Sequence, residues 1–253
     1  MMTQKQIEEI ELKYLNKFYF FLKFAEDEML KGFNTKEKIK KDWIEKYKSG
    51  ISDFAVGAER IVYSLFNGKG IGQPNSSPVG SDMFFEVDDA FIHIDLKTVQ
   101  TENIGDYTKN IFVGRNQNSY TTEIKKISNG ESFDPPRKYQ PALPTFYNKG
   151  LSNEKICLTY FVTILYERDN LNILNINLIC LPNGELETHY GNKVFQAGKN
   201  PDKSRFRFSE IPTFELIDEL PSRIKVIYFD KNMNQTLLNK LDFIHNIYLK
   251  QKD

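Results

Sequence analysis

Two long apolar runs constrain the fold of this chain more than any other feature. They read ICLTYFVTILY, residues 156–166, and LNILNINLICL, residues 171–181, with ERDN between them. Segments rich in β-branched and aromatic residues, followed here by the turn Pro182-Asn183-Gly184, are typical of buried strands. We therefore expect the two runs to be central strands, and their spacing allows them to pair as a hairpin.

Helical patterns and further strand patterns surround this hairpin in the sequence. Because 253 residues are enough for one large α/β domain and no linker clearly divides the chain, we expect a single domain over residues 1–253. The expected fold is α/β, a mixed central β-sheet flanked by helices. The helical N-terminal part, about 1–50, has more apolar positions than one face needs and is a candidate dimerisation element. Helices are predicted at 4–48 in two pieces, 52–66 and 234–250, strands at 82–87, 90–97 and 223–229, and a polar irregular segment at 100–150.

Composition narrows the function only a little. The 34 basic and 34 acidic residues cancel, so the chain lacks the basic excess common in DNA-binding proteins, although only the distribution of charge matters to a phosphate backbone. No apolar run reaches roughly 18 residues, and the acidic N-terminus lacks a signal-peptide core. Cys157 and Cys180 lie in apolar runs and are expected to be buried free thiols, which suits a cytoplasmic protein without membrane contact.

Charged residues interrupt the strand pattern GSDMFFEVDDAFIHIDLKTVQ at residues 80–100. Side chains alternate faces along a strand, so Asp95 and Lys97 point the same way at the end of the second strand. If the two strands pair through a turn at Asp88-Asp89, the ends that carry Asp82 and Asp95 come together. The alternative is a surface hairpin whose end carries an exposed Asp–Lys ion pair, and the apolar residues on the opposite face argue against it.

This pattern is suited to metal-assisted hydrolysis. Two adjacent carboxylates repel each other, and a Mg²⁺ ion, which binds one or two carboxylates together with water and phosphate oxygens, removes that repulsion. A lysine beside the metal can orient a water nucleophile or stabilise negative charge on the phosphate. Glu59, on the predicted helix before Asp82, is a candidate third acid.

The arrangement resembles the PD-(D/E)xK nuclease superfamily, and within it type II restriction endonucleases of the EcoRV and HincII kind. Ser81-Asp82 and Asp95-Leu96-Lys97 match the signature, Glu59 matches its upstream glutamate, and Ser81 stands where the signature has proline. The resemblance covers residues 59–120. It implies a Mg²⁺-dependent site-specific endonuclease that cuts double-stranded DNA to leave 5′-phosphates and acts as a homodimer. Asp82, Asp95 and Glu59 would hold the metal, and Lys97 would position the attacking water.

The polar segment after Lys97 is supplied with residues that read base edges in the major groove. A connection this long is unusual in a compact domain and tends to be functional, although a plain polar surface loop is the alternative. Further phosphate contacts are open to Lys109, Lys125, Lys126, Lys199, Lys203, Arg205 and Arg207, each of which has a solvated side chain as its alternative. The candidate DNA-binding residues are Gln100, Asn103, Asn110, Arg115, Asn116, Gln117, Asn118, Ser119, Tyr120, Arg137 and Lys138.

Three other readings stay open from the sequence. His93 lies on the same face of the strand as Asp95 and could be a general base. A structural hydrogen-bonded histidine is favoured, because His93 lies two residues away from Asp95 along the strand. A repair, recombination or phage-defence nuclease on the same fold would need fewer base-reading side chains. A non-catalytic DNA-binding module is the alternative from another class.

Overall fold

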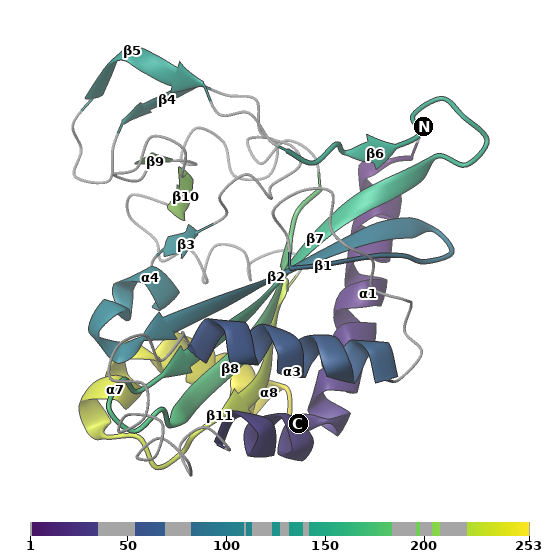
Figure 1. The fold of residues 1–253 in the computed structure, drawn as a ribbon. Helices are drawn as coiled ribbons and strands as arrows, with labels where there is room; N and C mark the ends of the chain where they lie inside the picture. The colour runs from purple at the N-terminus through teal and green to yellow at the C-terminus, as the bar shows by residue number, and fades with distance from the viewer. Residues whose placement is uncertain are drawn as a thin grey trace, which may run out of the picture.

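A mixed β-sheet with the strand order β1-β2-β7-β8-β11 forms the centre of the molecule (Figure 1). The computed structural model describes residues 2–34, 54–68, 82–108, 142–183 and 222–252, together with short strands at 110–112, 123–126, 132–138, 196–197 and 204–207. The strands of the central sheet are β1 (Met83–Glu86), β2 (Ala90–Gln100), β7 (Lys155–Tyr166), β8 (Ile173–Leu181) and β11 (Ile224–Phe229), and β6 (Phe146–Tyr147) pairs with β7.

The two apolar runs form the predicted hairpin. β7 and β8 pair antiparallel, with Thr163 opposite Asn177, and both strands are almost completely buried. β2 runs parallel to β7, which makes the sheet mixed, while β1–β2 and β8–β11 are antiparallel. Strands covered on both faces read as continuous apolar runs, and this is why the sequence identified them so readily.

Two hydrophobic clusters cover the two faces of the sheet. The first lies under α1 (Gln4–Phe24) and α3 (Phe54–Gly68) and receives Ile92 and Ile94 of β2. The second contains residues of α4 (Gly105–Thr108), α7 (Gln235–Lys240) and α8 (Asp242–Lys250), and it receives Phe161 and Leu165 of β7. Each fully buried apolar side chain contributes about 1.5–3 kcal/mol to stability. None of the helices in the described part of the chain is long and apolar enough to cross a membrane.

Helix ends differ from the predicted bounds. Thr3 caps α1 through a capping box with Gln6, but the helix stops at Ala25 before the chain becomes helical again at 26–34. The C-terminal helix, predicted as one piece, is broken at Leu241, whose φ of −106° and ψ of 12° are not helical. Helical periodicity continues across both breaks, so the sequence pattern gave no sign of them. The second piece of the predicted N-terminal helix, from about residue 35 to 48, lies outside the described residues.

The segment predicted as irregular, 100–150, contains more regular structure than its composition indicates. After β2 come a 3₁₀ turn (Thr101–Asn103), α4 and β3 (Asn110–Phe112), and β4 (Glu123–Lys126) pairs with β5 (Ser132–Lys138). β3 pairs with β10 (Ser204–Arg207), which also pairs with β9 (Gln196–Ala197). Two facts hid these strands: β3 finds its partner far away in the chain, and β5 contains Pro135 and Pro136, which are tolerated only in edge strands.

Candidate active site

The end of the β1–β2 hairpin brings the two predicted acids together. β1 pairs with β2 from Met83 opposite Ile94, so Asp82, the residue before β1, comes opposite Asp95. β2 continues beyond this point without β1 beside it. The Leu96 backbone N–H donates to Asp82 Oδ2 at 2.6 Å, so the aspartate side chain takes the place of the missing ladder partner. The turn at Asp88-Asp89 therefore sets the register that positions the acids, as predicted from the sequence.

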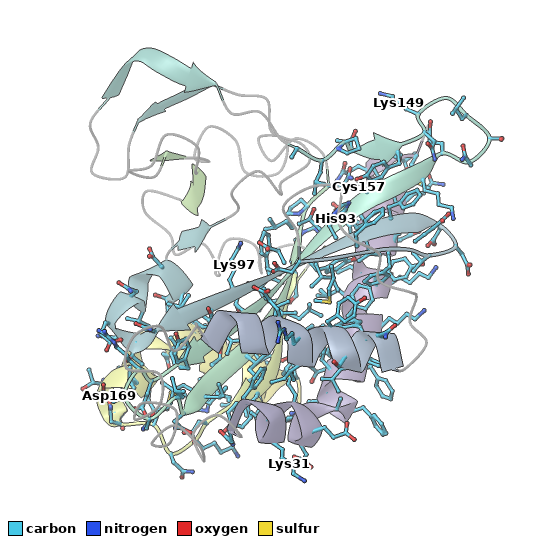
Figure 2. All side chains as sticks on the ribbon, in the orientation of Figure 1. Lys31, His93, Lys97, Lys149, Cys157 and Asp169 are labelled. Carbon is cyan, nitrogen blue, oxygen red and sulfur yellow. The ribbon has the colours of Figure 1, made fainter. Side chains whose placement is uncertain are left out.

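Asp95 is a buried carboxylate next to charged neighbours. Its residue is only 3% exposed, and its carboxylate forms an ion pair with Lys97 Nζ. The pKa of Asp95 is raised to about 7, chiefly by burial; the Lys97 ammonium acts to lower it, and the Asp82 carboxylate acts to raise it. Lys97 Nζ also lies 5.5 Å from the centre of the Phe161 ring, on the neighbouring strand. Figure 2 shows Lys97 and His93 projecting on the same side of the sheet, as the alternation along β2 requires.

Glu59 approaches this edge of the sheet from α3. It is half-buried, and burial raises its pKa, with the Asp82 charge acting in the same direction and the Lys97 and Arg60 charges acting against it. Glu59 thus lies within electrostatic range of both Asp82 and Lys97. Among the residues that the structure describes, no three acidic, histidine or cysteine side chains stand close enough together to hold a metal ion. The arrangement is a close pair, Asp82 and Asp95, with Glu59 further away.

The close pair fits a hard divalent cation. A carboxylate buried as deeply as Asp95 is normally compensated by a positive charge, and here Lys97 supplies only one charge for the two adjacent acids. Mg²⁺ is commonly bound through one or two carboxylates, with water and phosphate oxygens completing its coordination. The donor set of Asp82 and Asp95 is therefore suited to such an ion.

His93 has a structural environment, as the sequence favoured. It is completely buried, its Nε2 lies 3.0 Å from the Tyr147 hydroxyl, and its ring contacts Phe84 at 4.7 Å between centroids. Burial lowers its pKa to about 4, so the ring is neutral at physiological pH. These contacts fix β6 against the strand that carries Asp95, and they give His93 no access to a water nucleophile.

Only some of the candidate DNA-binding residues can be located. Gln100 is half-buried and donates to the Tyr166 hydroxyl at 3.0 Å, and Asn103 is exposed in the 3₁₀ turn. Asn110 lies on β3 opposite Arg207, and Arg137 and Lys138 lie on β5. Lys125 and Lys126 lie on β4, and Arg205 on β10. The candidates that lie outside the described residues are Lys109, Arg115, Asn116, Gln117, Asn118, Ser119, Tyr120, Lys199 and Lys203.

The sequence did not identify two features near the site. Asp89, predicted only as a turn residue, forms an ion pair with Lys13 at 2.7 Å and accepts a hydrogen bond from Tyr14, so it attaches the hairpin to α1. Tyr107, in α4, is buried against Asn175 and Asn177 of β8. The buried contact of Tyr107 could have been suspected from the sequence only because Asn175 and Asn177 stand at alternate positions within a strongly apolar strand.

Comparison with known proteins identifies the family of the chain. The model of the N-terminal domain of the type II restriction enzyme MwoI matches residues 3–170, and the model of its central domain matches residues 173–229. The boundary between these two matches falls in the turn between β7 and β8. No curated protein sequence matches the chain.

Two solved structures share the fold. The restriction endonuclease BglI bound to its DNA recognition sequence superposes with a TM-score of 0.66 at 16% identity, covering 89% of this chain and 91% of its own. The tetrameric restriction endonuclease SfiI bound to cognate DNA gives a TM-score of 0.64 at 15% identity, covering 92% and 88%. At these identities the likeness shows the fold alone.

Proposed function

The chain belongs to the MwoI family of type II restriction enzymes, and we propose that it cuts DNA with Mg²⁺ at the edge of the sheet where Asp82, Asp95 and Lys97 meet. Its class of activity, site-specific cleavage of DNA, follows from the family. The observation that carries the assignment of the site is the pairing of Asp82 with Asp95 beside Lys97, at the point where β2 extends beyond β1.

Each residue has a distinct proposed role. Asp82 and Asp95 would hold the Mg²⁺ ion, which when bound supplies positive charge to the scissile phosphate and lowers the pKa of water. Lys97, released from its ion pair with Asp95, orients the attacking water and stabilises the negative charge that develops on the phosphate oxygens. Glu59, in range of Asp82, supports the same site from α3. In-line attack then breaks the bond between phosphorus and the 3′ oxygen, which leaves a 5′-phosphate.

DNA binding is proposed for the polar residues that follow Lys97 along the chain. Gln100 is the last residue of the strand that carries Lys97, and Asn103 lies in the 3₁₀ turn that follows it. Asn110 of β3 pairs with Arg207 of β10 in the small sheet. Arginine and asparagine are the side chains that read guanine and adenine most often, which supports a base-reading role for this part of the molecule. BglI and SfiI were both solved bound to DNA. A structure of this chain bound to DNA would show whether these residues contact the bases.

We also propose that the chain is a single domain and acts as a homodimer in the cytoplasm. The central sheet supports a single domain, because β7 and β8 pair across the boundary between the two family matches. Two exposed phenylalanines on α1, Phe20 and Phe24, support a dimer element in the N-terminal helical part. A two-fold dimer would place one active site on each strand of a symmetric recognition sequence. Two buried free cysteines suit a reducing compartment.

Sequencing the ends of genomic DNA digested by the purified protein tests this function directly. We expect cutting at one short sequence, 5′-phosphate ends that ligate without further treatment, and complete loss of cutting in EDTA. Cutting that persists in EDTA would contradict the metal-dependent mechanism. Ends scattered without a common sequence would contradict its specificity.

A further inference from the structure

A buried hydrogen-bond network lies against β8, which β7 separates from the strand that carries Lys97. Tyr107 is only 1% exposed, and its hydroxyl donates to Asn175 Oδ1 at 2.5 Å while accepting from Asn177 Nδ2 at 2.9 Å. Asn175 Nδ2 in turn donates to the Tyr228 carbonyl oxygen at 2.7 Å. The network therefore connects α4 to β8 and β11. Each hydrogen bond in it has a defined donor and acceptor, in the order Asn177, Tyr107, Asn175 and the Tyr228 carbonyl.

The strand register places this network next to the candidate active site. Lys97 of β2 pairs with Thr163 of β7, and Thr163 pairs with Asn177 of β8. The Tyr107 hydroxyl also lies 3.4 Å from the Thr163 carbonyl oxygen. A line of neighbours therefore runs across three strands, from Lys97 to the asparagine that holds Tyr107.

Tyr107 also lies close in sequence to the small sheet. It lies in the four-residue helix α4, and strand β3 begins only three positions later, at Asn110. β3 pairs with β10 through Asn110 opposite Arg207. Tyr107 thus holds to β8 the segment that leads from β2 into the small sheet with its candidate DNA-binding residues.

The polar composition of this network needs an explanation, because apolar side chains would stabilise the same position more simply. Asn175 and Asn177 are fully buried in the middle of a strand, where asparagine is unfavourable. Burial raises the pKa of Tyr107 far above its usual range, so its hydroxyl stays protonated and its donor role is fixed. Buried hydrogen-bond networks of this kind specify one geometry, whereas apolar packing tolerates several.

We propose that Tyr107 is a positioning residue that couples β3, and the DNA bases it meets, to Lys97. This inference rests on the proposed function, since it assumes that Lys97 is catalytic and that the sheet of β3 contacts DNA. When the recognition sequence is bound, contacts with the DNA would hold β3 in one position. Tyr107 would transmit that position through Asn177 of β8 and Thr163 of β7 to Lys97 of β2. Loss of the hydroxyl would leave DNA binding intact and loosen the link to cleavage.

The test compares Tyr107→Phe with Tyr160→Phe. Tyr160 of β7 is an equally buried tyrosine, but it lies in the opposite cluster, and its hydroxyl donates to the Glu11 carbonyl oxygen at 2.8 Å. Tyr107→Phe removes the hydroxyl that bonds Asn175 and Asn177, and Tyr160→Phe removes the hydroxyl that bonds the Glu11 carbonyl oxygen, so unfolding experiments should show a loss of stability in both variants. The readouts are single-turnover cleavage of a plasmid with one mapped site, cleavage at sites with one altered base pair, and binding of the same DNA with Ca²⁺ in place of Mg²⁺.

We expect Tyr107→Phe to slow cleavage at the mapped site about tenfold, equivalent to about 1.4 kcal/mol of barrier, with affinity changed less than about threefold. Its preference for the mapped site over altered sites should fall by a similar factor. Tyr160→Phe should match the wild type in all three readouts. An unchanged rate and preference in Tyr107→Phe, or equal losses in both variants, would overturn the proposal. Wild-type protein that fails to cut any DNA would instead remove the proposed function itself.

Discussion

Asp95 and Lys97 form an ion pair on one face of β2, at the point where the strand extends beyond its neighbour β1. The pair is unequal, because Asp95 is almost completely buried while the Lys97 side chain is a quarter exposed. The Asp95 carboxylate is therefore held in a costly environment by a partner that can move away. Under the proposed function, Asp95 would hold the metal ion, and Lys97 would orient water or stabilise charge on the phosphate.

Replacing Asp95 with asparagine should stabilise the metal-free protein at neutral pH. The pKa of Asp95 is about 7 in the folded state and 3.8 in the reference state, so the folded state binds more protons between these values and wild-type stability decreases as pH rises through this window. Asp95→Asn lacks this titration and should exceed wild type by on the order of 3 kcal/mol at pH 8. Denaturant unfolding in EDTA measures the difference.

The control for this prediction is the same pair of proteins at pH 4.5, where we expect the difference in unfolding free energy to be much smaller. His93 titrates in the opposite sense: its lowered pKa removes stability as pH falls from 6.5 towards 4. Because both proteins contain His93, its effect cancels in the difference. If the difference in unfolding free energy between the two proteins did not change with pH, the raised pKa of Asp95 would be contradicted.

Binding of Mg²⁺ should stabilise the wild-type protein. At a Mg²⁺ concentration ten times the dissociation constant we expect a gain of about 1.4 kcal/mol, measured as a rise in the melting temperature. The gain should shrink at pH 6, because protons compete with the metal for Asp95. Asp88→Asn, which changes an exposed acid in the turn of the same hairpin, should keep the full shift. A full shift in Asp95→Asn would place the metal elsewhere.

Glu59 should contribute to cleavage and not to DNA binding. Glu59→Gln removes a negative charge within range of Asp82, and we expect single-turnover cleavage to slow about tenfold to a hundredfold at unchanged affinity. The matched control is Glu86→Gln on β1, where an exposed glutamate pairs with Lys155 at 2.6 Å, away from the site. Equal rates for the two variants would remove Glu59 from the active site.

The exposed phenylalanines of α1 give a test of the homodimer. Phe20 and Phe24 are 75% and 73% exposed and lie one helical turn apart. Light scattering should give twice the chain mass for wild type and a single chain mass for Phe20→Ser/Phe24→Ser. Leu151→Ser, at a position 63% exposed before β7, is the control and should remain dimeric. A dimer that survives the double substitution would move the interface to another surface.

The sequence allowed the Asp82–Asp95–Lys97 arrangement to be predicted because its geometry is local. Strand alternation and a short turn suffice to bring these three residues to one edge. Tyr107 was not predicted, because its partners Asn175 and Asn177 lie in a strand whose place beside β7 depends on the whole sheet. The strands β3 and β10 were missed for the same reason.

Cleavage of a plasmid with one mapped site, by wild type and by Lys97→Ala in Mg²⁺, tests the central claim most directly. We expect wild type to linearise the plasmid, and Lys97→Ala to bind the same site with similar affinity while its cleavage falls below detection. Lys13→Ala, which removes a lysine paired with Asp89 far from the site, should cut as wild type does. Cutting by Lys97→Ala at the wild-type rate would contradict the assignment of the active site to the end of β2.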